Sequence, residues 1–517
     1  MAAHQIELIL VLLLAALTLV TIADRIRIPY PMVLLIGGMV LAVAPGLPQI
    51  DLEPDLVFLL FLPPILFYAA YFTSWRDFRR NLRPIGLLAF GCVLMTTIAV
   101  AIVAKLFMPD MPWAVGFVIG AIVSPPDAVA ATAIFQRLGA PSQVVTILEG
   151  ESLVNDASAL IAYRFAVAAV VGGSFSMVEA SEEFLLLGVG GIALGLACGW
   201  LITRVTPYLP DSSVMTAFTL MMPAVIYVVA ERIELSGVLA VVAAGLYYGR
   251  SSSRAMTAAA RVRSRAVWDT VILVINSLVF ILIGLQLPHV VDGIVDVSIA
   301  TLIWRTAVIS ATVIVARFVW VFAVEYLPKW VLGREGDLGF SSTFIIAWSG
   351  LRGVVSLASA LALPIVTDSG ADFPYRNDVI FITFGVIVVT LFGQGAMIPL
   401  LLRRLGVTSD GSLEREERKA HAIAAKAALG YLDQVRDETW VPGDHHERLH
   451  HRFSHVMELK QMLPEDAREH MEQSDRLHHE VLVAAQQARV IAARSVTRRA
   501  CVSRRNSIWR TWRGSAD

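Results

Sequence analysis

The chain has 517 residues, of which 56% are hydrophobic and only 16% are charged, and its formal net charge is −1. Soluble domains carry about 25% charged residues, so this composition, with its mean hydropathy of +0.66, excludes an ordinary soluble domain. It predicts an all-α polytopic membrane protein.

Apolar windows long enough to cross a bilayer, about 17–25 residues each, predict about thirteen membrane helices. No small-residue cleavage site follows the first window, so we expect a retained span and not a signal peptide. The predicted spans lie near residues 6–23, 31–48, 54–73, 84–107, 113–136, 142–170, 181–203, 213–231, 235–249, 267–287, 300–324, 341–366 and 378–402.

Basic residues alternate between the loops that join these spans. Loops after odd-numbered spans carry 17 arginines and lysines, whereas loops after even-numbered spans carry three. Because basic residues favour the cytoplasmic side, we expect the N-terminus outside and the C-terminus in the cytoplasm.

The composition changes near Asp410, where helical periodicity with mixed charge replaces the apolar windows. The sequence therefore predicts a membrane domain over 1–408 and a soluble, helical cytoplasmic tail, with a regulatory role, over 409–517. Nine of the eleven histidines lie in this tail and could sense pH. Six of them form the pairs His445-His446, His450-His451 and His478-His479, which could bind a metal. A solvated helix surface is the simpler interpretation.

Two acidic residues stand in the fifth and sixth predicted spans, where an ionised group costs roughly 2.5–3.5 kcal/mol on insertion scales. They are Asp127 in SPPDAVAATAIF and Asp156 in GESLVNDASAL. Asp127 is 13 residues before Ala140, near the connecting turn, and Asp156 is 16 residues after it. Both should lie about 20–24 Å from that turn, measured along their helices. We expect one shared site near the middle of the membrane.

The fifth span is expected to be interrupted just before Asp127. Pro125 and Pro126 each remove a backbone donor and clash with the preceding turn, so carbonyls upstream lose their partners. Inside a membrane such carbonyls are tolerated only when they are buried in protein or line a cavity. A proline kink that serves packing is the alternative, but two prolines directly before an acid favour a functional site.

The sixth span presents several polar side chains. Ser152 and Asp156 are spaced i, i+4 and share one helix face, and Glu151 and Asn155 share the adjacent face. The oxygens of Asp127, Ser152 and Asp156 would suit a hard cation, and Asn155 could hold the Asp127 segment without adding charge. The alternative is a set of polar pairs that only join helices.

Two arginines in later spans are candidate partners for these acids. Arg352 lies between Gly350 and Gly353, which loosen the twelfth span, and Arg317 lies in the eleventh. Either could neutralise Glu151 or stabilise the opened helix, and a purely structural salt bridge is the alternative. A broken early span matched by a glycine-flanked late span predicts inverted repeats of six spans each.

These motifs resemble a known family. SPPDAVAATAIF, GESLVNDASAL, SGLRGVVS and FLPPILFYAAYF are similar, in order and spacing, to the first family of monovalent cation:proton antiporters. That family includes the NhaP-type bacterial proteins and the animal sodium/proton exchangers. The resemblance covers residues 5–405. It implies a homodimer in which a core domain with discontinuous helices moves against a fixed dimerisation domain.

The resemblance also implies roles for single residues. Asp156 would bind the cation and the proton alternately, and Glu151 would form a buried ion pair with Arg352. Tyr68 is a departure, because many relatives carry an acid at its position. The further ion-site residues that the resemblance implies are Asp127, Ser152 and Asn155.

The sequence therefore predicts a secondary transporter that exchanges Na⁺, with K⁺ or Li⁺ as further cargo, for H⁺ in a one-for-one exchange at Asp156. We expect it in a bacterial inner membrane, with roles in Na⁺ extrusion and pH control. A K⁺/H⁺ antiporter is the main alternative. Two others are an uncoupled channel and an intramembrane aspartyl hydrolase that uses Asp127 and Asp156. With no nucleotide loop or zinc spacing, we expect no enzyme, no cofactor and no nucleic-acid partner.

Overall fold

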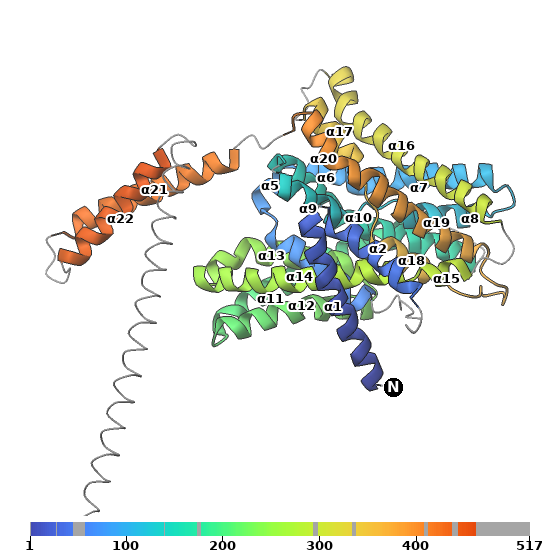
Figure 1. Cartoon of the computed structure of the whole chain (residues 1–517), viewed down its shortest axis with the longest axis horizontal. Coiled ribbons are helices and arrows are strands. Elements are labelled where there is room, and N and C mark those ends of the chain that lie inside the picture. Colours follow the sequence, from blue (N-terminus) through green and yellow to red (C-terminus); the bar gives the residue numbers. More distant parts are fainter. Residues whose placement is uncertain are drawn as a thin grey trace, which may run out of the picture. The chain divides into compact units, whose positions relative to one another are not determined.

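The computed structural model describes residues 2–26, 28–44, 57–138, 140–172, 177–292, 298–332, 338–407, 412–436 and 443–461. The chain divides into two units, Met1–Ser409 and Asp410–Asp517. The described residues are helical and contain no strand beyond an isolated bridge between Val366 and Asp372. The predicted all-α class is confirmed (Figure 1).

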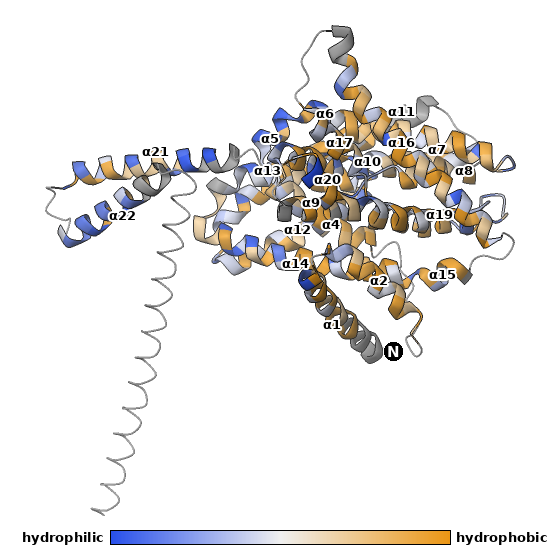
Figure 2. Cartoon of the chain, turned by 45° about the horizontal axis from the view of Figure 1, so that its top comes forward, coloured by the Kyte–Doolittle hydropathy of each residue, from blue (hydrophilic) through white to orange (hydrophobic). Residues whose placement is uncertain are grey.

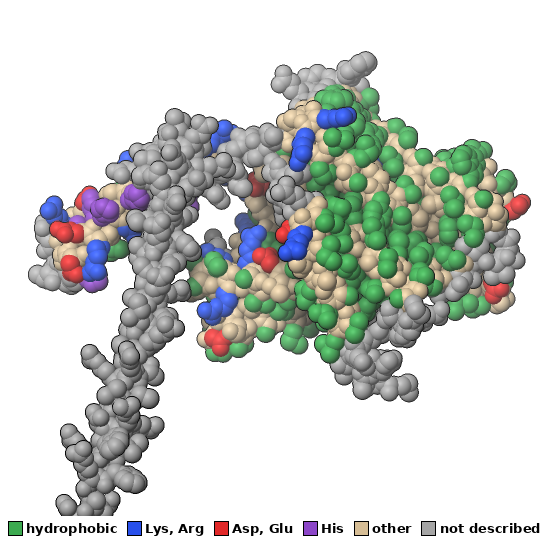
Figure 3. All heavy atoms as spheres, viewed as in Figure 1, with side chains coloured by type: hydrophobic (Ala, Val, Ile, Leu, Met, Phe, Trp, Pro, Cys, Tyr) green, Lys and Arg blue, Asp and Glu red, His purple; other side chains and the backbone are tan. Residues whose placement is uncertain are grey.

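Seven described helical segments are long and apolar enough to cross a membrane. Hydrophobic residues dominate the helices of the first unit (Figure 2), and apolar side chains cover much of its surface (Figure 3). Exposed apolar surface on this scale requires a lipid environment, so the predicted multi-pass membrane protein is confirmed. The seven segments are Leu82–Phe107, Ser142–Val171, Leu186–Tyr208, Ser212–Arg232, Ala258–Leu285, Ile299–Leu327 and Arg376–Arg404.

Helices overlap every span that the sequence predicts, although a count of thirteen membrane crossings and the inverted repeats stay predictions. The segments up to residue 171 are α1 (Ala2–Ile26), α2 (Tyr30–Ala42), η1 (Val57–Phe61), α4 (Leu62–Phe72), α5 (Trp75–Arg80), α6 (Leu82–Gly86), η2 (Leu87–Cys92), α7 (Val93–Phe107), α8 (Trp113–Val123), α9 (Ala128–Leu138) and α10 (Ser142–Val171).

The later segments of the first unit include one of its two broken regions, between α17 and α18, and several helices of membrane length. They are α11 (Met177–Val205), η3 (Thr206–Tyr208), α12 (Ser212–Arg232), α13 (Gly237–Ala255), α14 (Ala258–Leu285), α15 (Leu287–Asp292), α16 (Ile299–Leu332), α17 (Phe340–Trp348), α18 (Val354–Leu361), α19 (Arg376–Val388), η4 (Val389–Gln394) and α20 (Gly395–Arg404).

Small residues allow helices of this unit to approach closely. Gly191, Gly195 and Gly199 recur every four residues on α11 and face α13, where a Cβ added at Gly195 would collide with the carbonyl of Ala240. Such a small-residue stripe lets two membrane helices pack backbone to backbone. The larger of two buried apolar clusters surrounds the two broken regions and includes Ile119, Ile346 and Leu351, all at most 1% exposed. The breaks therefore lie inside a tightly packed core.

The second unit contains α21 (Ser412–Gln434) and α22 (Gly443–Gln461), which lie in the predicted tail and pack against each other. The Nε2 atom of His446 is 2.9 Å from the carbonyl of Leu432, and its ring stacks on that of His450. Within the described residues, no three His, Cys, Asp or Glu side chains are grouped to hold a metal ion. The predicted helix after residue 461 and the pair His478-His479 lie outside the described residues.

Candidate ion-binding site

The predicted interruption of the fifth span is present, and a second one interrupts the twelfth. Helix α8 ends at Val123 and α9 begins at Ala128, while α17 ends at Trp348 and α18 begins at Val354. The two breaks meet, because the backbone N–H of Asp127 donates to the carbonyl of Leu351 at 2.7 Å. Backbone groups that have lost helical partners thus bond each other.

Asp127 lies where two half-helices begin. Its Oδ1 atom accepts a hydrogen bond from the backbone N–H of Val129 at 2.8 Å, which caps α9. Gly353, directly before α18, lies against it, because a Cβ added at this glycine would collide with the Asp127 carboxylate. Helix N-termini carry partial positive charge. Two of them therefore stabilise the negative charge of this partly buried acid.

Arg352 donates hydrogen bonds to backbone carbonyls where α8 and α17 end. Its Nε atom donates to the carbonyl of Val123 at 2.7 Å and its Nη2 atom to that of Ser124 at 3.3 Å, and its Nη1 atom bonds the carbonyl of Gly350. These carbonyls lack helical partners, and a cation complements the negative end of α8. The backbone N–H of Arg352 donates to Thr390 Oγ1 at 3.2 Å. Thr390 is a supporting residue that the sequence did not indicate.

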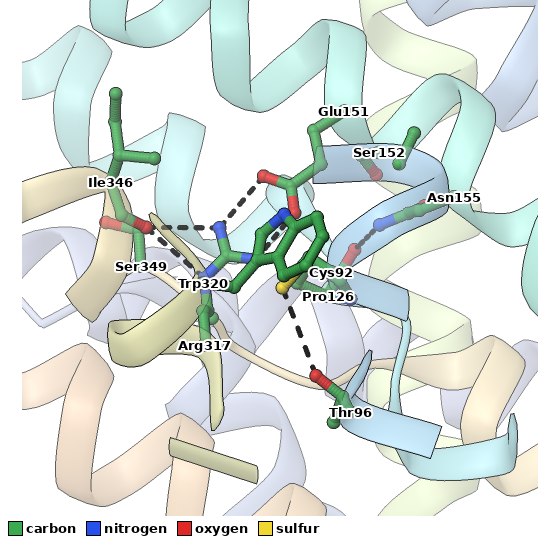
Figure 4. A network of polar contacts seen from close by, with 12 residues as sticks. Cys92, Thr96, Pro126, Glu151, Ser152, Asn155, Arg317, Trp320, Ile346 and Ser349 are labelled. Carbon is green, nitrogen blue, oxygen red and sulfur yellow. Dashed lines mark hydrogen bonds and ion pairs between the residues drawn. The ribbon is translucent and has the colours of Figure 1, made fainter. Parts of the chain in front are cut away.

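Glu151 is paired with Arg317 of α16. Two guanidinium nitrogens lie 2.5 and 2.8 Å from the two carboxylate oxygens, and both side chains are only 1% exposed. Arg317 also donates to the carbonyl of Ile346, near the end of α17, at 3.1 and 3.3 Å (Figure 4). The ion pair of Glu151 with Arg352, which the resemblance implied, is therefore wrong for this chain. The donors of Arg352 are directed to backbone carbonyls instead.

Helix α10 holds the first break through two side chains. Asn155 Nδ2 donates to the carbonyl of Pro126 at 2.8 Å (Figure 4), the kind of contact predicted for this amide. Ser152 Oγ accepts from the N–H of Ala128 at 3.3 Å. Asn155 Oδ1 is buried and has no hydrogen-bond partner within the described residues. It is an oxygen that remains available to a ligand.

Asp156 follows on the same helix and is 8% exposed. It lies one helical turn after Ser152, whose Oγ bonds the backbone N–H of Ala128, the residue after Asp127. In the described part of the chain no basic side chain forms an ion pair with it. Two neighbouring carboxylates repel each other when both are charged, so either a proton or a cation stabilises the pair. Together with Ser152 and Asn155 they form an oxygen-rich site of the kind that hard cations prefer.

Tyr68, the departure from the family pattern, is bonded to an acid from another helix. Its hydroxyl donates to Oδ1 of Asp269, on α14, at 2.6 Å. The sequence reasoning did not single out Asp269, although an acid inside the tenth apolar span was the signal that could have indicated it. The position where many relatives carry an acid thus has a carboxylate beside it.

Replacing Gly353 with alanine should impair the site, because the new methyl group would collide with the Asp127 carboxylate. Overpacking of this kind costs about 1–3 kcal/mol, and relief requires Asp127 or the second break to move. Cation-dependent proton flux in membrane vesicles is expected to fall strongly while expression is retained. Gly393→Ala is the matched control, because a Cβ there meets open space. Equal flux in both variants would contradict the close packing of Gly353 on Asp127.

Residues 9–404 match the family model described as "Sodium/hydrogen exchanger, transmembrane". A sodium, potassium, lithium and rubidium/H⁺ antiporter of Bacillus pumilus is 33% identical over 82% of this chain, which spans 66% of that relative's length. The Na⁺/H⁺ antiporter ApNhaP of Aphanothece halophytica is 31% identical, and the match covers 84% of this chain and 81% of that relative's length.

Among solved structures, the sodium proton antiporter MjNhaP1 of Methanocaldococcus jannaschii has a similar fold. The TM-score is 0.63 at 18% sequence identity, and the match covers 78% of this chain and 99% of that protein. At this identity the likeness concerns the fold, which has the helical architecture described above.

Proposed function

This chain belongs to the transmembrane sodium/hydrogen exchanger family, and we propose that it exchanges Na⁺ for H⁺ across a membrane, with K⁺ and Li⁺ as further cargo. The observation that carries this proposal is the pair of carboxylates, Asp127 and Asp156, at the crossing of two broken helices. Relatives whose names specify Na⁺/H⁺ antiport, one with K⁺, Li⁺ and Rb⁺ as well, support the choice of cargo.

The two carboxylates have different roles in this proposal. Asp127 caps α9 and lies beside the start of α18, so its charge is stabilised without a bound ion. Asp156 has no such partner among the residues that the structure describes, and it binds either a cation or a proton. The cation would be held by Asp156 together with the oxygens of Ser152 and Asn155, and its departure lets a proton take its place. Alternating access then exposes the loaded site to the other side.

An electroneutral exchange of one cation for one proton follows from this division of roles. Only Asp156 changes its occupancy in the cycle, because Asn155 adds no charge and Glu151 is neutralised by Arg317. One positive charge therefore moves each way. The same rate at different clamped membrane voltages is the expected result in proteoliposomes, whereas a rate that follows the voltage would reject the one-for-one stoichiometry.

The proposed setting is a bacterial inner membrane. The distribution of arginines and lysines favours an outer N-terminus and a cytoplasmic C-terminus. We also propose a homodimer, in which the helices that carry the site move relative to a fixed partner surface, with Na⁺ extrusion and pH control as the cellular roles. Cysteine accessibility at the two termini and crosslinking in intact membranes test these assignments.

Proton flux in inside-out membrane vesicles tests the transport itself. An acid interior is established first, and then Na⁺, K⁺, Li⁺ or choline is added. Transported cations should release the proton gradient and choline should not, and the order of half-saturating concentrations gives the preference. A response to K⁺ alone would favour the K⁺/H⁺ alternative, and cation uptake without proton release would favour a channel.

Competition for one carboxylate predicts the sign of the pH effect. As pH falls, protons occupy Asp156 and the half-saturating cation concentration should rise, by at most about tenfold per pH unit for one-for-one linkage. The maximal rate at saturating cation should change much less. A half-saturating concentration that is independent of pH over two units would contradict a shared site.

A further inference from the structure

A deep apolar groove of about 670 Å³ lies between α10, α11 and α13, separate from the ion site. Its α13 wall runs from Leu239 to Arg250, and α11 contributes residues from Gly188 to Leu196. The α11 side chains are open to the surroundings, with Val189 65% exposed. Because apolar surface dominates its walls, the occupant must be apolar along most of its length.

The groove has the length of a lipid chain in one leaflet. The eleven residue steps from Leu239 to Arg250 correspond to about 16 Å along α13. Half of a hydrocarbon core of about 30 Å is about 15 Å. The positive-inside distribution places Arg250 at the cytoplasmic end. An acyl chain that enters from the inner leaflet therefore fits along the groove.

One end of the groove is basic and aromatic. Arg250 lies 5.7 Å from the ring centroid of Trp75, and both residues line the groove beside Tyr247. No carboxylate pairs with Arg250 in the described part of the chain. Trp75 begins α5, whose last turn adds the exposed Arg79 and Arg80. This combination suits a phosphate at the membrane surface.

We propose that this groove binds an anionic phospholipid, with one acyl chain between α10, α11 and α13 and its phosphate on Arg250. The positive charge of Arg250 favours an anionic headgroup, and the length of the groove matches that of an acyl chain. The hydroxyl of Ser158, which lines the groove, donates to the carbonyl of Ala89 at 2.5 Å. Because this hydroxyl already has a hydrogen-bond partner, it can lie against an apolar acyl chain.

The bound lipid would contact α10, the helix that carries Asp156, on a face other than the one that holds the break. Val154, Ser158 and Ile161 line the groove at i, i+4 and i+7 spacing on α10, whereas Asn155 holds the break from another face of the same helix. The lipid thus occupies a seam along which α10 lies against α13. This placement is independent of which cation the chain carries, so lipid binding and transport can fail separately.

Native mass spectrometry of the full chain in detergent tests the headgroup assignment. Dioleoyl phosphatidylglycerol is titrated against dioleoyl phosphatidylcholine, and the wild type should prefer the anionic lipid. Arg250→Gln should reduce that preference by about fivefold, because one basic group near the surface is lost. Arg204→Gln is the matched control, since Arg204 also lies over a tryptophan, Trp200, at 5.8 Å but does not line the groove. Equal losses in both variants, or an unchanged preference in Arg250→Gln, would overturn the assignment.

A second variant tests the chain position. A Cβ at Gly188 has only Leu239 within reach, at 3.8 Å, so Gly188→Phe should fill the groove and remove one bound lipid of either headgroup. Gly393→Phe, at an open position outside the groove, should not. Phosphatidylglycerol with eight-carbon chains provides a measurement that needs no variant and should bind more weakly than the dioleoyl form. Equal binding of both chain lengths, or full binding by Gly188→Phe, would place the lipid elsewhere.

Discussion

Asp156→Asn should abolish cation-dependent proton flux while the protein still folds. Asparagine keeps the shape of the side chain but neither releases a proton nor offers a negative charge. Loss of one partner from a buried charge pair costs about 3–5 kcal/mol, which is about two to four orders of magnitude in affinity. Flux in inside-out vesicles, normalised to the amount of folded protein, measures the effect.

The matched control is Asp110→Asn, which makes the same chemical change in an exposed turn after α7. It should transport like the wild type. Asp156→Glu keeps the charge and should retain part of the flux with an altered cation order. Wild-type flux in Asp156→Asn would remove Asp156 from the site, and Asp127 would then be the acid to test next.

The residues of the candidate site could be singled out from the sequence because the free-energy cost of placing them in a membrane is local. Two prolines before Asp127 break any helix, and an acid in an apolar window is expensive wherever the helices lie. The i, i+4 spacing on α10 needed only helical geometry. The crossing of the breaks, with the Asp127 N–H bonded to Leu351, joins segments more than 200 residues apart and could be predicted only as a repeat pattern.

Pairing across long distances in the chain was not predictable in the same way. Both arginines had the charge to neutralise Glu151, and the packing of α16 and α10 against the same helix, α17, brings Arg317 to it. The bond between Tyr68 and Asp269 spans 201 positions. The short helix α5 and the π-helical segments were not predicted either, because a window of apolar residues indicates a helix but not its local geometry.

The ion pair of Arg317 with Glu151 should contribute strongly to stability. Arg317→Leu leaves a carboxylate buried at 1% exposure without its partner, which costs about 3–5 kcal/mol. Arg164→Leu is the control, because it breaks the Arg164–Glu231 pair, whose side chains are 49% and 31% exposed. Exposed pairs contribute only about 0–1 kcal/mol. Thermal unfolding in detergent, with both variants prepared alike, measures the difference.

The double variant Glu151→Leu/Arg317→Leu separates the pair from the second role of Arg317. Replacing a buried ion pair by apolar side chains is often close to neutral, so the double variant should recover part of the lost stability. Recovery should be incomplete, because the carbonyl of Ile346 loses its donor in both cases. If the single and double variants are equally unstable, Arg317 acts on the end of α17 alone. If the single variant matches Arg164→Leu, the buried pair is not a stabilising element of the fold.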